Sequence, residues 1–359
     1  MRPTFIEIDK SALKHNIMRI KALCPSQKIV AMVKANAYGC GIEAVVPTIS
    51  DDIDIFGVAC LEEAMKLRQY TSKPCVLFQG VFSETELSQV LELELDCVIH
   101  HTEQLKWLLS TPLSKPIRIW LKVNTGMNRL GFEPNEINPI LEALRHCSWV
   151  ENSIVLLSHM ACADEPAHPQ NKAQLELFNA IPVSNDVLQS FANSALILTS
   201  PKAHYDIVRP GLMLYGVSPL KDKTSSELNL YPVMSFISTL SVIHEFPANR
   251  GIGYSATWRT TKPTRIGVVA AGYGDGYPRH IDVHAQVWLN DTRVPIVGRV
   301  SMDMLTLDLS NVPDAMLGDR VELWGKHLLV EEVAQHAGTI PYELLTQVSS
   351  RVREKLRLC

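Results

Sequence analysis

Eight short apolar runs alternate with longer amphipathic segments between Ser11 and about Gly216, and this alternation constrains the fold of the 359-residue chain most strongly. Alternating strands and helices are typical of parallel sheets, because a helix returns the chain to begin each new strand. Eight such steps match the size of a (β/α)8 TIM-type barrel, an α/β fold; a doubly wound sheet is the alternative. The predicted strands are Ile29–Lys34, Ile55–Cys60, Cys75–Gln79, Asp96–His100, Ile117–Val123, Ile154–His159, Phe191–Ala195 and Ile207–Tyr215.

The segments between these runs have helical periodicity and carry residues that favour helix starts. Ser11, Ser83 and Thr102 are residue types that cap helix N-termini. Pro134 and Pro169 suit the first turn of a helix. We therefore expect helices at Leu61–Tyr70, Glu84–Leu93, Glu136–Arg145 and Lys172–Ile181.

A polar stretch at 221–226 (KDKTSS) separates the alternating strand and helix patterns from a region of alternating, β-branched segments. We expect a barrel domain over 1–225, with residues 1–9 able to pair with the second domain, and a mainly-β domain over 226–359. Asn290-Asp291 is a hairpin-turn candidate. The tail 330–358 reads as helical, with the basic run 351–357 as a solvated helix face. The predicted strands of the second domain are Ser235–Phe246, Arg265–Ala271, Ala285–Leu289, Val294–Val297 and Met304–Leu309.

The composition argues against several classes of partner. The formal net charge is −4, and no stretch forms a basic face, so we expect neither nucleic acid nor membrane partners. The opening residues MRPTFIEIDK contain no apolar signal-peptide core, which predicts a cytoplasmic protein. The 8 cysteines form no Cys-x-x-Cys or metal-like cluster, so we expect no metal site and mostly buried cysteines.

The lysine that ends the first predicted strand is the main candidate for chemistry. A lysine at this point would lie at the carboxyl mouth of a barrel, where such enzymes place their active sites. Burial lowers the pKa of a lysine and yields the neutral amine that a Schiff base requires. From position alone, Lys34 could equally extend into solvent at a strand end.

A series of motifs lies around Lys34 and further along the chain. They are 33–41 (VKANAYGCG), 123–131 (VNTGMNRLG), 158–165 (SHMACADE), 192–194 (ANS), 208–211 (VRPG), 253–257 (GYSAT) and 301–303 (SMD). In this order they resemble the motifs of the alanine racemases, a family that uses pyridoxal 5'-phosphate (PLP), and the likeness spans both domains. Cys40 and Ser301 depart from the residues that the family often has, at positions not expected to carry protons.

The resemblance implies a two-base racemisation assisted by PLP as the electron sink. Lys34 would bind the coenzyme and act as base on one face, and Tyr254 of the partner subunit in a homodimer would act on the other. The resemblance also implies that His159 contacts the tyrosine and that Arg209 contacts His159. A guanidinium keeps its proton, so Arg209 would leave the ring nitrogen unprotonated and shorten the life of the carbanion.

The resemblance assigns further residues to the coenzyme and the substrate. Barrels of this kind commonly bind phosphate after strands seven and eight, where Ser194, Gly211 and Leu212 lie. Arg129 would pair with the substrate carboxylate, assisted by the Met302 N–H of the partner. Lys122 matches a position that is carbamylated in many members. The remaining coenzyme residues are Tyr38, Asn193 and Tyr342, and the access-channel candidates are Asp164, Tyr273, Arg279 and Arg299.

The function predicted by the resemblance is interconversion of L- and D-alanine, with D-alanine supplied for peptidoglycan. A non-catalytic PLP-binding barrel is one alternative, although a second domain and Tyr254 argue against it. A decarboxylase of basic amino acids is another, and Arg209 in place of an acidic group argues against that. Racemisation of serine or of a wider set of amino acids stays open.

Overall fold

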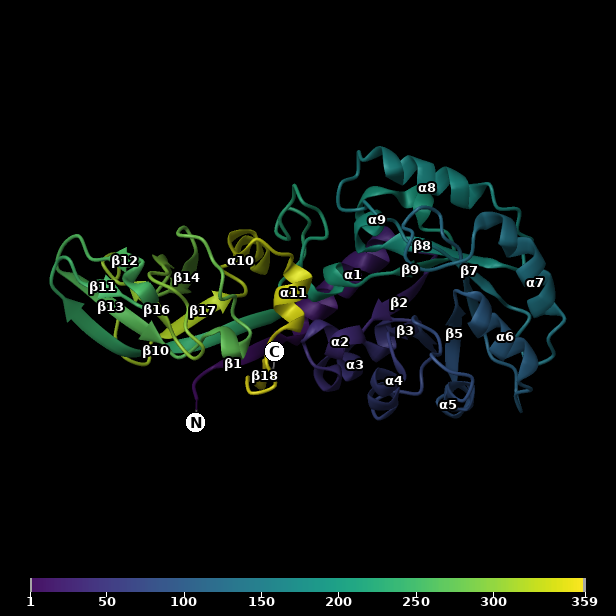
Figure 1. Ribbon diagram of the computed structural model, residues 1–359, viewed down its shortest axis with the longest axis horizontal. Helices are drawn as coiled ribbons and strands as arrows, with labels where there is room; N and C mark the ends of the chain where they lie inside the picture. The colour runs from purple at the N-terminus through teal and green to yellow at the C-terminus, as the bar shows by residue number, and fades with distance from the viewer. Residues whose placement is uncertain (1, 358–359) are drawn as a thin grey trace.

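In the computed structural model, which describes residues 2–357 apart from the side chains of 353–357, eight parallel strands close into a barrel (Figure 1). The first and last strands pair through Lys28 and Ile207, which closes the ring and rules out a doubly wound sheet. The eight predicted strands are therefore confirmed. They are β2 (Lys28–Met32), β3 (Ile55–Val58), β4 (Cys75–Leu77), β5 (Leu95–Ile99), β6 (Ile119–Lys122), β7 (Val155–Leu157), β8 (Leu188–Asn193) and β9 (Ile207–Arg209).

Two barrel strands differ most from their predicted bounds. β8 begins at Leu188, three residues before the predicted start. β9 ends at Arg209 instead of continuing to Tyr215, because Pro210 has no N–H to donate to a ladder. Residues Leu212–Tyr215 instead form a short 3-10 turn, η4.

Helices surround the barrel and bury one apolar stripe each. In α7 the buried residues Ile137, Ile140, Leu141 and Leu144 recur at helical spacing. The helices of this part are α1 (Lys10–Leu23), α2 (Lys34–Tyr38), α3 (Ile42–Ile49), α4 (Leu61–Arg68), α5 (Glu86–Glu92), α6 (Thr102–Ser110), α7 (Ile137–Arg145), α8 (Pro169–Asn179) and α9 (Ser194–Thr199). None of the helices within 2–357 is long and apolar enough to cross a bilayer.

The predicted helices begin within three residues of their predicted starts, but the predicted residues do not provide the caps. Asp9 caps α1 by accepting from the N–H groups of Ser11 and Ala12, and the Ser11 hydroxyl bonds the same carboxylate. The His101 ring caps α6, where Thr102 was predicted. Ser83 does not cap α5, whose N-cap residue is Thr85 and makes no side-chain capping hydrogen bond.

The second part of the chain is built on a long antiparallel strand, β10 (Met234–Phe246), which pairs with β1 (Phe5–Asp9), β13 and β17. Residues 5–9 of the N-terminus thus lie in the sheet of the β domain. The other elements are β11 (Gly251–Ile252), β12 (Trp258–Arg259), β13 (Thr264–Val269), β14 (Gln286–Leu289), β15 (Thr292–Pro295), β16 (Leu305–Asp308), β17 (Arg320–Trp324), β18 (Arg353–Arg357), α10 (Val330–Ala337) and α11 (Pro341–Thr346).

The hairpin prediction is confirmed, and one helix prediction is wrong. Asn290 and Asp291 join β14 to β15 with φ values of 46° and 57°, as a tight hairpin turn requires. The predicted helical tail is confirmed over α10 and α11. The basic run 351–357 is not a helix face, because its residues 353–357 form β18, which pairs in parallel with β1. Leu358 lies outside the described residues.

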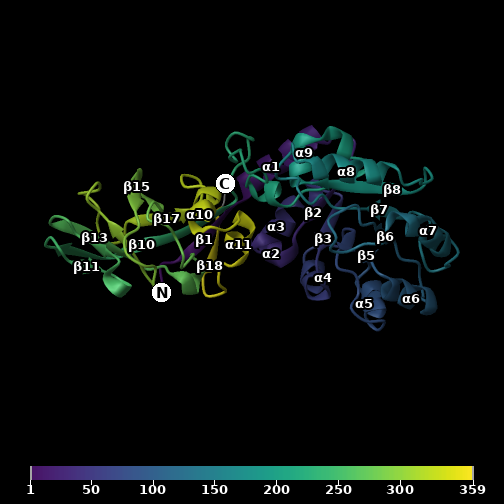
Figure 2. The same cartoon turned by 45° about the horizontal axis from the view of Figure 1, so that its top comes forward.

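The barrel and the β domain lie side by side along the long axis of the molecule, joined by β1, α11 and the segment before β10 (Figures 1 and 2). The helix α11 packs on α2, directly after Lys34. A Cβ on Gly39 would overlap the carbonyl oxygen of Leu345, so only glycine allows this approach, and its φ of 79° also favours glycine. The β domain thereby supplies one wall of the barrel mouth.

Candidate active site

Five of the predicted site residues lie at the carboxyl ends of barrel strands. Lys122, Asn193 and Arg209 are the last residues of β6, β8 and β9. Lys34 and His159 each follow the end of a strand, β2 and β7, by two residues. Because all the strands of the barrel are parallel, these side chains share one mouth.

A cavity of about 800 Å³ opens at this mouth. Barrel residues line one side and the α10–α11 region of the β domain lines the other. The predicted site residues in its wall are His159, Asp164, Asn193, Leu212 and Tyr342. The structure therefore joins residues from both domains of one chain around a single space of ligand size.

Tyr38 connects Lys34 to the neighbouring predicted residues. The backbone turns sharply after Lys34 and brings the buried Tyr38 ring against Tyr215, with ring centroids 4.7 Å apart. The Tyr342 ring lies 6.0 Å from Tyr38. A Cβ on Gly211 would come within 2.5 Å of the Tyr38 hydroxyl, so glycine is needed at that position. Burial raises the pKa of Tyr342 to about 12, which keeps its phenol protonated and able to donate.

Ser194 forms the centre of a compact polar cradle beside these rings. Its Oγ accepts from the Gly211 N–H at 2.9 Å and from the Met213 N–H at 3.3 Å. Both contacts use lone pairs, which leaves the hydroxyl proton for an outside acceptor. Asn193 caps α9 by accepting from the Leu196 N–H at 3.2 Å, and so orients the start of this segment.

Arg209 is fixed inside the barrel by three hydrogen bonds. Its guanidinium donates to the Ser190 Oγ at 2.6 Å, to the Ser158 carbonyl at 2.6 Å and to the Phe191 carbonyl at 3.2 Å. Burial lowers the pKa of Arg209 to about 10, which still leaves it charged at neutral pH. A rigid cation therefore stands at the floor of the mouth.

The mouth gathers cations, and this shifts the pKa values of its titratable groups. Burial lowers the pKa of Lys122 to about 8, helped by Arg209, Arg129 and Lys34. Burial and then Arg209 and the same lysines hold the pKa of His159 well below its ordinary value, so its imidazole is neutral. Burial and Arg129 also lower the pKa of Lys34. This excess of positive charge suits an anionic ligand such as a phosphate or carboxylate.

Most of the remaining predicted residues lie on the β domain and do not reach the mouth of their own chain. Tyr254 is 68% exposed and Met302 is 53% exposed. Tyr254 lies between β11 and β12, at the end of the β domain that is distant from the barrel in both views (Figures 1 and 2). The exposed channel candidates Tyr273, Arg279 and Arg299 share this domain, whereas Asp164 lies on the barrel, 3.3 Å from Lys221.

Two arginines from opposite ends of the chain hold the loop that carries Met302. Asp275 is fully buried and accepts from Arg2 at 2.6 Å and from Arg351 at 2.8 Å. The same arginines reach the Asp303 carboxylate at 3.4 Å and 2.9 Å. Arg351 also donates to the Met302 carbonyl at 3.3 Å. The exposed loop is therefore held in place by its own chain.

Sequence reasoning missed the residues that orient the predicted ones. Ser158 and Ser190 bind Arg209, and the predicted strand that starts at Phe191 excluded Ser190. Buried Gln174 donates to Thr125 and to the His159 carbonyl, at 3.2 Å and 3.0 Å. For Ser158 and Gln174 the available signal was a polar residue on the apolar face of a predicted strand or helix. For Ser190 there was none, because it lay outside the predicted strand.

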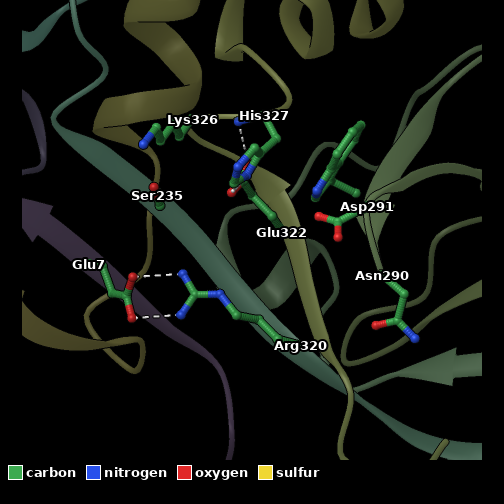
Figure 3. Close-up of a pocket in the computed structure, with 9 residues that line it drawn as sticks. Glu7, Ser235, Asn290, Asp291, Arg320, Glu322, Lys326 and His327 are labelled. Atoms are coloured by element: carbon green, nitrogen blue, oxygen red, sulfur yellow. Dashed lines mark hydrogen bonds and ion pairs between the residues drawn. The ribbon is translucent and has the colours of Figure 1, made fainter. Parts of the chain in front are cut away.

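A second groove, of about 490 Å³, lies on the β domain and contains none of the predicted residues (Figure 3). Its charges include two internal pairs. Glu7 accepts from Arg320 at 2.8 Å and 2.7 Å, and Glu322 lies 3.1 Å from His327. Because Glu7 and Arg320 already pair with each other, and no predicted site residue lines this groove, the barrel mouth is the better candidate for chemistry.

Comparisons with known proteins agree with the motifs over the whole chain. The family models "Alanine racemase, N-terminal domain" and "Alanine racemase, C-terminal domain" match residues 8–219 and 233–356. An alanine racemase of Legionella pneumophila (strain Corby) is 54% identical over 99% of both chains. The biosynthetic alanine racemase of Pseudomonas aeruginosa is 44% identical over 98% of both.

Solved structures give the same result. The biosynthetic alanine racemase of Pseudomonas aeruginosa superposes with a TM-score of 0.95 at 43% identity, covering 100% of both chains. An alanine racemase of Bartonella henselae, described with covalently bound pyridoxal phosphate, has a TM-score of 0.90 at 27% identity and covers 99% of this chain and 100% of its own. The resemblance read from the motifs is confirmed: this chain belongs to the alanine racemase family.

Proposed function

We propose that this protein is a PLP-dependent alanine racemase that interconverts L- and D-alanine. The observation that carries the proposal is Lys34, a lysine of lowered pKa at the barrel mouth, next to the cradle around Ser194 and Gly211. The near-full-length likeness to alanine racemases supports the reaction and the substrate.

The residues present at the mouth fit PLP. The proton of the Ser194 hydroxyl and the bare backbone at Gly211 suit a phosphate, and the Tyr38 and Tyr342 phenols, with Leu212 and Asn193, complete the holding residues. When bound, PLP supplies an aldehyde that condenses with the Lys34 amine and a conjugated ring that withdraws electrons from the α-carbon. The lowered pKa of Lys34 supports this role, because a neutral amine is the nucleophile.

Arg209 sets the electronic character of the site in this proposal. Its guanidinium is charged, rigid and held by Ser190 and Ser158, so it can donate a hydrogen bond to the pyridine nitrogen without transferring a proton. An acidic group there would protonate the ring and favour longer-lived carbanions. The arginine therefore supports a racemase over a decarboxylase.

Arg129 binds the substrate carboxylate in the proposed complex, and the partner's Met302 N–H assists it. Lys122 lies in the same group of cations, and its pKa of about 8 gives a substantial neutral fraction at physiological pH. A neutral amine can take up CO2 as a carbamate, which would place a negative charge beside Arg129 and Arg209. We include this carbamate in the proposal.

Two bases on opposite faces complete the reaction. Lys34 exchanges a proton with the α-carbon on one face, and the partner's Tyr254 exchanges one on the other. His159, neutral in this site, would orient that phenol by hydrogen bonding. The exposure of Tyr254 and Met302, at a distance from their own barrel, supports a homodimer with sites shared between subunits.

The broader role follows from the reaction. D-alanine formed by this bacterial family would enter peptidoglycan synthesis in the cytoplasm, and the two domains would divide near residues 225 and 226. Asp164, Tyr273, Arg279 and Arg299 would line the access channel, three of them contributed by the partner.

Solvent-deuterium exchange tests the proposed function. The protein is incubated in deuterated water with single enantiomers of a panel of amino acids, and the α-deuterium content and chirality of each are measured. We expect exchange with racemisation of alanine, and at most slow exchange of serine. Loss of CO2 without racemisation would point to a decarboxylase, and no exchange with any amino acid would point to a carrier.

A further inference from the structure

The chain adopts an unusual conformation immediately after Lys34. Four successive residues, Ala35, Asn36, Ala37 and Tyr38, have φ values of 52°, 52°, 55° and 53°. L-residues other than glycine avoid this left-handed region, and when they occur there they are usually single. Such a turn persists only where the surrounding structure holds it in place. Whatever holds this turn also sets the directions of Lys34 and Tyr38.

The carboxylate of Glu63 spans the base of this turn. Glu63 lies in the first turn of α4. Its Oε1 accepts from the Ala35 N–H at 2.6 Å, and its Oε2 accepts from the Ala59 N–H at 2.8 Å. One side chain therefore links the residue after Lys34 to the loop at the carboxyl end of β3.

Lys66, one helical turn further along α4, holds the other side of the turn. Its ammonium donates to the Asn36 Oδ1 at 2.8 Å and pairs with Glu43 at 2.8 Å. The same Asn36 oxygen accepts from the Ile42 N–H at 3.2 Å. Charge-assisted hydrogen bonds are stronger than neutral ones. The bonds from Glu63 to the Ala35 N–H and from Lys66 to the Asn36 side chain are therefore suited to stabilise a strained backbone.

Glu63 also acts on Lys34 through its charge. It raises the pKa of the Lys34 amine, opposing the burial and the Arg129 charge that lower it. Lys122 and His159 face the same space from β6 and the end of β7, and both are influenced by Lys34. Within the described residues, Glu63 is the acidic group that acts on Lys34 most directly.

We propose that Glu63 is a positioning residue for the active site, which locks the left-handed turn and thereby directs Lys34 and Tyr38 into one mouth. Lys66 assists it from the same helix. The proposal rests on the proposed function, in which Lys34 and Tyr38 hold PLP. It goes beyond that function, which assigns Glu63 no contact with the coenzyme or the substrate.

The test replaces Glu63 with Gln, which has one acceptor oxygen and turns an NH2 toward the second backbone N–H. Each holoenzyme is measured for PLP dissociation, for kcat and KM with alanine, and for thermal stability. We expect Glu63→Gln to weaken PLP binding by roughly 10- to 100-fold and to lower kcat about tenfold. KM should change little, because Arg129 lies in the loop that follows β6 and not in the turn that Glu63 holds. Glu63→Asp keeps the charge and should fall between Gln and the parent.

Glu62→Gln is the matched control, since it removes the same charge from the same first turn, on an exposed side chain. It should behave as the parent in every measurement. If Glu63→Gln retains parental PLP affinity and kcat, or if Glu62→Gln loses as much as Glu63→Gln, the proposal is wrong. Should Glu63→Gln unfold, the Glu63→Asp variant decides by the same criteria.

Failure of this inference can be told apart from failure of the proposed function. Borohydride reduction followed by peptide mapping reports whether the parent joins PLP to Lys34, independently of activity. A parent that does not join PLP to Lys34 contradicts the proposed function. A parent that does, with a Glu63→Gln variant that retains PLP equally well, contradicts the positioning role alone.

Discussion

The barrel mouth and the exposed loops of the β domain are two parts of one proposed site, and they are built in opposite ways. At the mouth, Arg209 and Ser194 are buried and are held by hydrogen bonds within their own chain. On the β domain, Tyr254 and Met302 are more than half exposed. Arg209 and Ser194 are already surrounded by atoms of their own chain. Tyr254 and Met302 remain exposed until another surface covers them.

This difference indicates where the chemical tuning takes place. The mouth lowers the pKa of Lys34 and Lys122 by burial and by neighbouring cations, all from one chain. The β domain contributes shape, because Asp275 and its two arginines fix a loop whose side chains face outward. A single chain would thus bind the coenzyme but lack the second base. The following experiments test whether the mouth binds the coenzyme alone and depends on a partner's loop for the second base.

The largest effect is expected for Lys34→Ala. Without the amine, PLP has no covalent anchor and one face of the substrate has no base, so racemisation should fall by at least ~10⁴-fold. Visible absorbance of the bound coenzyme and a racemisation assay measure the loss. Lys28→Ala, at the opposite end of the same strand, is the control and should keep full activity. Substantial activity in Lys34→Ala would remove the basis of the proposal.

Mixing two inactive variants tests the division between the mouth and the loops directly. Lys34→Ala lacks the mouth base and Tyr254→Phe lacks the loop base. If the loop acts in the partner's mouth, random re-pairing creates heterodimers with one intact site, and about a quarter of the parental activity should return. Activity is measured after the subunits are dissociated and reassociated. No recovery, despite mixed dimers seen by mass spectrometry, would place both bases in one chain.

Ser194→Ala should weaken coenzyme binding without abolishing it. The variant removes a hydroxyl that orients two backbone N–H groups and donates to phosphate, so PLP affinity should fall by roughly 10- to 100-fold. Equilibrium dialysis with PLP measures the change. Ser200→Ala, at the end of the same helix, is the control. Equal affinity in both variants would exclude Ser194 from the phosphate cradle.

Much of the barrel could be predicted from sequence because its signal is local. Each strand is a short apolar run, and a lysine at the end of such a run must lie at the carboxyl mouth once the strands are parallel. Strand ends were harder to predict, because apolar residues continue past Arg209 into a 3-10 turn after Pro210. Only the basic end of the tail was misassigned, since this short segment carries a weak helical pattern and pairing with β1 decided its conformation.

The candidate site was only partly predictable for a different reason. The motifs identify residues that meet the ligand, but they do not identify residues that hold those residues in place. Glu63 and Ser190 act through contacts between elements distant in sequence, such as α4 with the turn after Lys34. The hydrophobic periodicity of a sequence carries no information about such contacts. Left-handed φ values in four successive residues are equally invisible in a sequence without glycine at those positions.

Lys122 should make the stability of the chain depend on pH. Its pKa falls from an ordinary 10.5 to about 8 in the folded state, so the unfolded chain binds more protons between these values. Stability in bicarbonate-free buffer should therefore rise as the pH rises from 8 to 10.5. Lys122→Met removes the buried charge and should stabilise the fold by ~1–3 kcal/mol at pH 7, with a smaller gain at pH 10.

Urea unfolding at the two pH values measures this effect. Carbamylation would replace the positive charge of the parent's Lys122 with a negative one beside Arg129 and Arg209. Bicarbonate should therefore stabilise the parent at pH 7 and reduce the gain from Lys122→Met. Equal stability of parent and variant at both pH values, with and without bicarbonate, would mean that the cations of the mouth do not destabilise the fold.

The smallest effect is expected on the β domain, from two arginine variants that remove the same charge. Arg351→Gln loosens the loop of Met302, although Arg2 still binds Asp275. Arg320→Gln breaks the pair with Glu7 in the groove of Figure 3, away from that loop. Partly exposed ion pairs contribute ~0–1 kcal/mol, so both variants should lose little stability.

Only Arg351→Gln should raise KM for alanine, by about two- to fivefold, because only that arginine holds a loop proposed to reach the partner's site. Steady-state kinetics on both variants measure the difference. A parental KM in Arg351→Gln would mean that the partner's mouth, and not the loop's own chain, orders Met302. In that case the loop of Met302 would become ordered only when two subunits assemble, and its own arginines would not hold it in place beforehand.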